Sequence, residues 1–157
     1  MACSPANKKQ IAKYLGAQTI GYDKLNQLRH LYYLKDKETT HAHMMELGKL
    51  IGKKFEITLA ALEGLRGLGI AEWTEPRGGY FVSLDVMPKT AKRVIELMKG
   101  AGVTLTDVGA TFPYGIDPED KNLRLAPTYP SDKDLEKATE ILVVAVKLAA
   151  LEKLLEA

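Results

Sequence analysis

The chain has 157 residues, of which 46% are hydrophobic and 27% are charged, a composition that excludes intrinsic disorder and indicates one globular domain, alone or with an appended arm. Its 22 basic and 20 acidic residues leave a formal net charge of only +2, which argues against nucleic-acid binding because such proteins concentrate a basic excess. A lone cysteine, Cys3, cannot form an internal disulfide, and no stretch has the pattern of a signal peptide or a membrane span, so a cytoplasmic protein without membrane contact is expected.

Two short helices are predicted at the start of the sequence. Ser4 followed by Pro5 is a helix start, because a hydroxyl caps free backbone donors and proline in the first turn loses no hydrogen bond. This helix is expected to run to about Leu15 and to stop at Gly16. Asp23 is expected to cap a second helix, whose leucines are Leu25, Leu28, Leu31 and Leu34.

A much longer helix is predicted next, from Thr39 or Thr40 to Leu65. Apolar residues recur there every three or four positions and form one stripe on a helix of about seven turns. The stripe consists of Met44, Leu47, Ile51, Phe55, Leu59, Leu62 and Leu65. Glycines at 64, 67 and 69 are expected to end the helix.

The second half of the sequence mixes strands with helices. The expected elements are strands at Ala71–Thr74 and Tyr80–Leu84, a helix at Ala91–Gly100, strands at Val103–Leu105 and Leu123–Ala126, and a last helix capped by Ser131. We therefore predict an α/β fold: a helical N-terminal arm and a long connecting helix, followed by an α+β small domain with a mixed or antiparallel sheet covered by helices. The long loop at Thr106–Lys121 is a candidate functional segment.

Metal binding and nucleophilic catalysis find little support in the sequence. His41 and His43 are two positions apart and cannot share a helical face, so solvated histidines are expected instead of a metal pair. Cys3 has no visible activating group. The glycines near position 67 lack the preceding strand and following helix of a phosphate-binding loop. No catalytic residue and no metal ligand are assigned.

Arg124 is the strongest site candidate from chemistry alone. It lies in an otherwise apolar strand, and the alternation places Leu123 and Leu125 on the opposite face. A guanidinium in that position needs an anionic partner, to which it can offer two parallel donors. The partner is either a neighbouring Asp or Glu, which chemistry alone favours, or the carboxylate of a ligand.

Four segments of the sequence, in a fixed order, resemble a known enzyme family. They are QTIGYDKLNQLRH at Gln18–His30, WTEPRGGYFVSLD at Trp73–Asp85, TAKRVIELMKGAGVTLTDVGATF at Thr90–Phe112, and DPEDKNLRLAPTYPS at Asp117–Ser131. They resemble class I/II, fold-type I aminotransferases that use pyridoxal phosphate, and within these the bacterial aspartate-aminotransferase-like branch often called MocR-like. The resemblance implies that Arg124 holds the α-carboxylate of an amino-acid or 2-oxo-acid substrate. It also makes Phe112 and Tyr114 weaker candidates for the site wall, although packing of their loop onto the sheet is the favoured explanation.

The resemblance also implies a division of the chain. Family members are more than twice as long, and their Schiff-base lysine, the aspartate facing the pyridine nitrogen and the phosphate-holding loop precede the matched region. Lys8 and Lys9 do not lie in the serine-rich turn that carries the family's lysine. The sequence is thus similar to the C-terminal portion of such an enzyme, with residues 1–37 as the end of the large domain, 38–68 as the connecting helix and 69–157 as the small domain.

Three expectations for the chain by itself follow from this resemblance. It should neither bind pyridoxal phosphate nor catalyse transamination, and its uncovered apolar stripes should favour a dimer or a swapped arrangement. A competing hypothesis is a non-catalytic small-domain module that serves binding or assembly. A transcription regulator is less favoured, because no basic recognition helix is visible.

Overall fold

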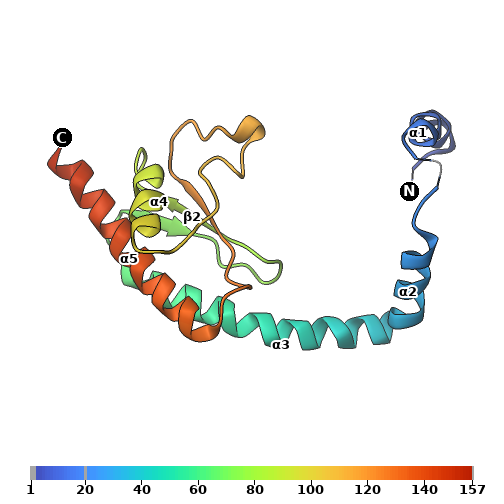
Figure 1. The fold of residues 1–157 in the computed structure, drawn as a ribbon, viewed down its shortest axis with the longest axis horizontal. Coiled ribbons are helices and arrows are strands. Elements are labelled where there is room, and N and C mark those ends of the chain that lie inside the picture. The colour runs from blue at the N-terminus through green and yellow to red at the C-terminus, as the bar shows by residue number, and fades with distance from the viewer. Residues whose placement is uncertain (1–2, 20, 157) are drawn as a thin grey trace. The chain divides into compact units, whose positions relative to one another are not determined.

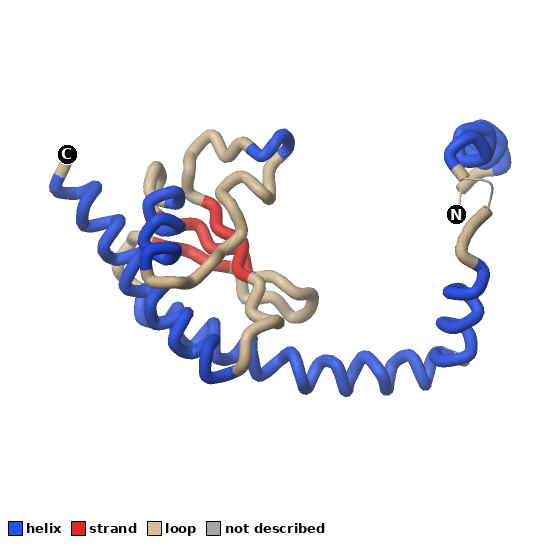
Figure 2. The backbone as a smooth tube through the Cα atoms, in the orientation of Figure 1, coloured by secondary structure: helices blue, strands red, loops and turns tan. Residues whose placement is uncertain are grey.

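The computed structural model describes residues 3–19 and 21–156 (Figure 1). The chain divides into two compact units, Met1–Glu46 and Leu47–Ala157. Its helices are α1 (Pro5–Gln18), α2 (Lys24–Leu34), α3 (Lys37–Leu62), α4 (Ala91–Gly100) and α5 (Asp132–Leu155), and its strands are β1 (Ala71–Trp73), β2 (Val82–Val86) and β3 (Asn122–Leu125). Figure 2 shows how these helices and strands alternate with long loops. The predicted mixed fold, helical first and then built around a small antiparallel sheet, is confirmed.

The first unit begins with a helix whose start was predicted correctly and whose end was not. The Asn7 backbone N–H donates to Ser4 Oγ at 3.3 Å, and Pro5 occupies the first turn. The expected stop at Gly16 is wrong, because α1 continues to Gln18. Gly16 is not among the glycines with positive φ, so its backbone stays helical and does not make the left-handed turn that ends a helix.

The other two helix starts in this unit are set by aspartates. The Asn26 N–H donates to Asp23 Oδ1 at 2.9 Å, which confirms the predicted cap of α2. The expected cap of α3 at Thr39 or Thr40 is wrong, since the helix begins at Lys37 and the Thr39 N–H donates to Asp36 Oδ1 at 2.8 Å. That hydrogen bond lowers the pKa of the Asp36 carboxyl.

The first unit has no core of its own within α1 and α2. Neither helix contains a buried residue. The leucines Leu25, Leu28 and Leu31 and the tyrosines Tyr32 and Tyr33 are exposed. The stability of these helices therefore comes mainly from their caps and local bonds, since no apolar side chain of either helix is fully buried.

The second unit is built on a three-stranded antiparallel sheet in the order β1-β2-β3. Along β2, residues alternate between buried and half-buried, with Val82, Leu84 and Val86 on the buried face. The register pairs Leu84 with Leu123 and Ser83 with Arg124. One face of the sheet is thus apolar and the other is polar.

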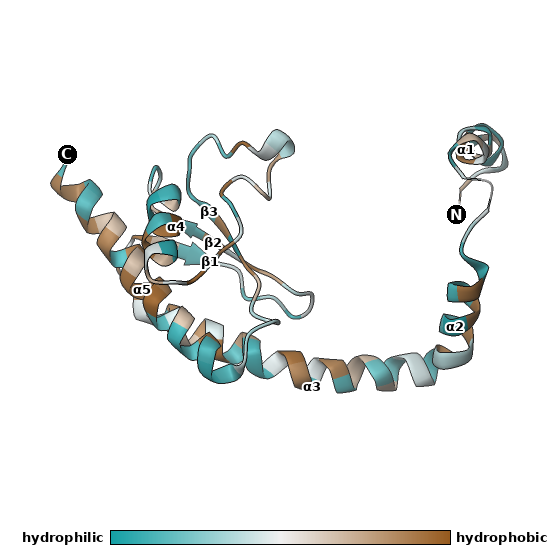
Figure 3. Cartoon of the chain, viewed as in Figure 1, coloured by the Kyte–Doolittle hydropathy of each residue, from teal (hydrophilic) through white to brown (hydrophobic). Residues whose placement is uncertain are grey.

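The apolar face of the sheet forms one core with helices α4 and α5 and the end of α3. Its buried members include Phe55, Leu62, Leu65, Leu84, Val94, Met98, Leu123, Leu142 and Val146. Figure 3 shows the hydrophobic residues of α5 interleaved with hydrophilic ones. The predicted start of α5 at Ser131 is confirmed, because its Oγ accepts from the Asp134 N–H at 3.2 Å. No helix among the described residues is long and apolar enough to cross a membrane.

The predicted strand at Val103–Leu105 is wrong. The Val103 N–H donates to Met98 O at 2.9 Å, so the chain is still closing the end of α4 at this point. Gly102, with φ of +83°, makes the left-handed turn that this closure requires. Val103 and Leu105 both pack against the core. This packing explains why apolar residues alternate with Thr104 although the segment is not a strand. The strand predicted at Tyr80–Leu84 is displaced to Val82–Val86.

Candidate functional site

The polar face of the sheet carries the candidate site. Ser83 and Asp85 of β2 lie opposite Arg124 and Asn122 of β3 in the register, and all four point away from the core. They share this face because side chains alternate along a strand while directly paired residues point the same way.

Arg124 is half-buried on this face and forms no ion pair with any described residue. Its Nε is buried and has no hydrogen-bond partner. Its Cζ lies 4.7 Å from the centroid of the Phe81 ring, a cation–π arrangement. No carboxylate of the described residues forms a salt bridge with it. The intramolecular ion pair that chemistry alone favoured is thus not present in the described part of the chain.

Arg66 shows what a satisfied guanidinium looks like in the same unit. Its Cζ also stacks on an aromatic ring, 4.9 Å from the centroid of Trp73. Unlike Arg124, it donates from Nε to Glu63 Oε2 at 2.6 Å and from Nη2 to Glu75 Oε1 at 2.9 Å. The hydrogen bond to Glu63, followed by that to Glu75, raises the pKa of Arg66. Both arginines stack on an aromatic ring, but only the guanidinium N–H groups of Arg124 are not bonded to a carboxylate of the described residues.

Asn122 connects the polar face to the long loop before β3. Its Nδ2 donates to Ser83 Oγ at 2.9 Å and to Asp85 Oδ1 at 2.6 Å. Its Oδ1 accepts from Thr111 Oγ1 at 2.7 Å. Asn122 lies two residues before Arg124 on the same face, so the position of this face and that of the loop are set together.

Asp117 fixes the entry into β3. Its Oδ2 accepts from the backbone N–H groups of Lys121 and Asn122, each at 2.8 Å, and its Oδ1 accepts from Glu119 N–H at 3.0 Å. Burial alone would raise the pKa of this carboxyl, but the backbone donors, Asn122 first, together bring the pKa below its ordinary value.

We expect acid to weaken the second unit through Asp117. A carboxylate with a lowered pKa contributes stability that is complete above the ordinary Asp pKa of about 3.9 and is lost as the pH falls from there through the lowered pKa in the fold. Asp117→Asn removes that charge, so its free energy of unfolding should change less than that of the unmodified chain between about pH 5 and 2.5. Urea unfolding followed by circular dichroism across this range measures the difference.

Asp107 provides the control for this prediction. It is exposed, and its carboxylate accepts no hydrogen bond from the described residues. Asp107→Asn should therefore leave the pH dependence of unfolding unchanged. Equal slopes for Asp117→Asn and the unmodified chain would contradict the role given to Asp117.

Neither of the loop candidates, Phe112 and Tyr114, forms a cation–π contact with Arg124 in the described chain. Phe112 is half-buried, whereas Tyr114 is 98% exposed and adopts a left-handed backbone with φ of +60°. Tyr114 is therefore not packed onto the sheet. Neither aromatic ring stacks on the guanidinium in the described chain, where Arg124 has Phe81 as its ring partner.

The loop is closed by an unusually tight approach at Gly109. This residue is buried, with φ of +89°, and a Cβ built on it would lie 2.1 Å from Gly115 O. Only glycine can occupy such a position without displacing backbone.

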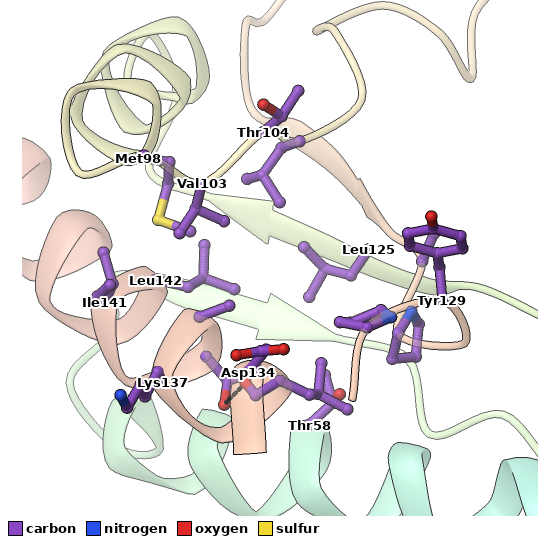
Figure 4. Close-up of a pocket in the computed structure, with 18 residues that line it drawn as sticks. Thr58, Met98, Val103, Thr104, Leu125, Tyr129, Asp134, Lys137, Ile141 and Leu142 are labelled. Atoms are coloured by element: carbon purple, nitrogen blue, oxygen red, sulfur yellow. Dashed lines mark hydrogen bonds between the residues drawn. The ribbon is translucent and has the colours of Figure 1, made fainter. Parts of the chain in front are cut away.

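A cavity of about 540 Å³ opens in the second unit, and Arg124 does not line it (Figure 4). Its walls are mainly apolar and include Met98, Val103, Leu125, Tyr129, Ile141 and Leu142. The carboxylate of Asp134, which also lines it, is occupied by a bond from Ser131 Oγ at 2.6 Å. The next residue along β3, Leu125, faces the cavity, so strand alternation places the guanidinium on the other face. The described residues contain no cluster of three metal-binding side chains.

Sequence reasoning assigned no role to two residues of this face. Phe81 stacks on Arg124, and Asn122 bonds to both β2 and the loop. The sequence did offer a signal for Phe81. It lies two residues before Ser83 and four before Asp85, so strand alternation puts it on the polar face. Which residue of β3 it meets depends on the register between strands that are almost forty residues apart, and the sequence did not specify that register.

Comparison with known proteins gives one consistent family. The chain matches the family described as aspartate amino-transferase over residues 1–157. It is 45% identical over 150 residues to an aspartate aminotransferase of Corynebacterium glutamicum, covering 95% of this chain and 35% of that protein. The crystal structure of an aspartate transaminase from the same species superposes with a TM-score of 0.89 at 44% identity, covering 96% of this chain and 36% of that one.

A more distant structure shares the fold. The α-aminoadipate aminotransferase of Thermus thermophilus, solved with N-(5'-phosphopyridoxyl)-L-leucine, superposes with a TM-score of 0.76 at 19% identity, over 96% of this chain and 38% of its own. The chain thus spans about a third of the length of the proteins that it matches.

Proposed function

This chain belongs to the aspartate aminotransferase family, and we propose that it supplies the substrate-carboxylate site of a pyridoxal-phosphate-dependent aminotransferase that acts on amino acids and 2-oxo acids. Arg124 holds the α-carboxylate. The observation that supports this role is the unpaired guanidinium on the polar face of the sheet. We also propose that the chain belongs to the bacterial aspartate-aminotransferase-like branch called MocR-like and that it lies in the cytoplasm. Its 45% identity to an aspartate aminotransferase of Corynebacterium glutamicum supports the aspartate-aminotransferase-like part of this proposal.

The chemistry of Arg124 suits a planar anion. A guanidinium offers parallel N–H donors that match the two oxygens of a carboxylate, and it stays charged at any physiological pH. Two such bonds fix the direction of the Cα–H bond of an amino acid, which is the bond broken first in transamination. Pyridoxal phosphate, when bound, supplies the electron sink for that step.

The described residues of this chain do not fit the cofactor by themselves. A phosphate group binds at free N–H donors of a helix N-terminus. Here one such donor of each helix already bonds to a side chain, which belongs to Ser4, Asp23, Asp36, Asp120 and Ser131 at the N-termini of α1, α2, α3, α4 and α5.

Lys53 and Lys121 do not resemble a Schiff-base lysine, whose amine must be neutral to react. The hydrogen bond to Asp132 raises the pKa of Lys53. Likewise, the hydrogen bond to Glu119 raises the pKa of Lys121. Both amines therefore stay charged, and we propose that the reactive lysine and the phosphate site belong to the remaining two thirds of such an enzyme.

A second candidate function is a non-catalytic module that binds or assembles. It is favoured by the core of the second unit, which buries Leu62, Leu65, Leu84, Leu123 and Leu142 without a further domain. A reading frame beside this one that encodes the rest of an aminotransferase would support the first candidate over the second.

The test is binding of an amino acid to the 157-residue chain. L-Aspartate added to ¹⁵N-labelled protein should shift the nuclear magnetic resonance signals of Arg124 and its neighbour Ser83 in a saturable way. Arg124→Gln should abolish the shift, because an amide offers no charged fork. Arg77→Gln is the matched control, since Arg77 is exposed in the turn before β2 and has no ion pair within the described chain.

Two outcomes would contradict the proposal. A saturable shift retained by Arg124→Gln would place the carboxylate site elsewhere. Steady keto-acid production by the chain with added pyridoxal phosphate, abolished by a single lysine substitution, would show that the chain holds its own reactive lysine.

A further inference from the structure

The guanidinium of Arg124 is held by one aromatic ring. Phe81 lies just before β2, and strand alternation places it on the same face as Ser83. Ser83 pairs with Arg124, so Phe81 is the diagonal neighbour of Arg124 across the two strands. Its ring centroid lies 4.7 Å from the arginine Cζ. The ring is 48% exposed, so core packing alone does not account for an aromatic residue at this position.

The nitrogens of Arg124 differ in their access to a ligand. Nε is buried without a partner. Nη1 and Nη2 make no bond to the described residues and are not buried, so they are the donors that a carboxylate can reach. An arginine side chain has many rotamers, and holding it in one of them costs conformational entropy. Arg66 is held by Glu63 and Glu75 as well as by its ring, whereas Arg124 has the ring without carboxylates.

Building on the proposed function, we propose that Phe81 is a positioning residue for Arg124. Its ring holds the guanidinium flat on the polar face, so that Nε stays buried and the pair Nη1 and Nη2 receives the carboxylate end-on. An Asp or Glu partner would also hold the guanidinium in place, but it would occupy the N–H donors that the ligand needs. An aromatic face orients the arginine and leaves every acceptor position to the substrate.

The test compares Phe81→Leu with Phe81→Tyr in the full 157-residue chain. The probe is sodium acetate, with sodium chloride at equal ionic strength as the reference, and the readout is the Nε–Hε signal of each arginine. Phe81→Leu should bind acetate roughly two- to fivefold more weakly, the factor expected for one exposed cation–π contact. Its Arg124 Hε signal should also lose the shift that a nearby aromatic ring imposes. Phe81→Tyr, which keeps the ring, should retain both properties.

Tyr80 supplies the matched control. It is the neighbouring exposed aromatic, and its ring stacks on no guanidinium of the described chain. Tyr80→Leu should bind acetate like the unmodified chain, and the Arg66 signal should stay in place in every variant.

The outcomes separate this proposal from the function on which it rests. Acetate binding by Phe81→Leu equal to that of the unmodified chain overturns the role of Phe81 while leaving Arg124 as the carboxylate site. No saturable response in the unmodified chain, or one that survives in Arg124→Gln, overturns the carboxylate site and this proposal with it.

Discussion

Replacing Leu84 by alanine is expected to lower the free energy of unfolding of the second unit by about 2–5 kcal/mol. Leu84 is 0% exposed at the centre of the middle strand. It is paired with Trp73 on one side and Leu123 on the other. Removing three carbon atoms there loses their transfer free energy and leaves a cavity that two hydrogen-bonded neighbours prevent from collapsing.

Urea unfolding followed by circular dichroism measures this loss. Leu151→Ala is the control, because Leu151 is 55% exposed on α5 and alanine is a good helix former. That substitution should change the free energy of unfolding by less than about 1 kcal/mol. A loss below about 1 kcal/mol for Leu84→Ala would show that the core does not depend on the middle strand as described.

Gly109→Ala should open the loop that precedes β3 and cost about 1–3 kcal/mol. The added Cβ would lie 2.1 Å from Gly115 O and 2.5 Å from its carbonyl carbon, and both are backbone atoms that cannot rotate away. Alanine also disfavours the φ of +89° at this position. Loop opening separates Thr111 from Asn122, so the polar face loses its link to the loop.

Limited proteolysis of the loop, together with the side-chain amide signal of Asn122, checks this expectation. Gly100→Ala is the control, since a Cβ at Gly100 meets no atom within 4 Å and its backbone is helical. It should be neutral or stabilising, because alanine favours the helix. Proteolysis of Gly109→Ala at the rate of the unmodified chain would mean that the close approach to Gly115 is dispensable.

Local signals predicted the helices better than they predicted the strands. Asp23 and Ser131 were identified as caps because a helix start is specified within about four residues. The start of α3 was missed because Asp36 competes with the threonines three positions later, and the sequence does not rank these caps. Val103–Leu105 was mistaken for a strand because apolar alternation also arises in a segment that packs on a core without pairing.

One part of the candidate site, Arg124, could be predicted from the sequence, and its ring partner could not. Arg124 was identified because a charge inside an apolar strand needs a partner, which is a local property. The identity of that partner is a property of the sheet register, and the register depends on pairing between distant strands. The aromatic ring of Phe81 therefore took the place in which a neighbouring carboxylate was expected.

The exposed leucines of α2 can contribute free energy to association with another surface. Leu25, Leu28 and Leu31 are 76%, 45% and 62% exposed, and burying a fully exposed leucine is worth about 1.5–3 kcal/mol. Folding of the described chain buries none of these three side chains fully, since α2 has no buried residue. Because these side chains are already partly covered, any surface that buries what remains exposed would recover about 3–5.5 kcal/mol before the entropic costs of association. The exposed leucines of α2 therefore contribute more to the stability of a complex in which another surface buries them than to the stability of the folded chain alone.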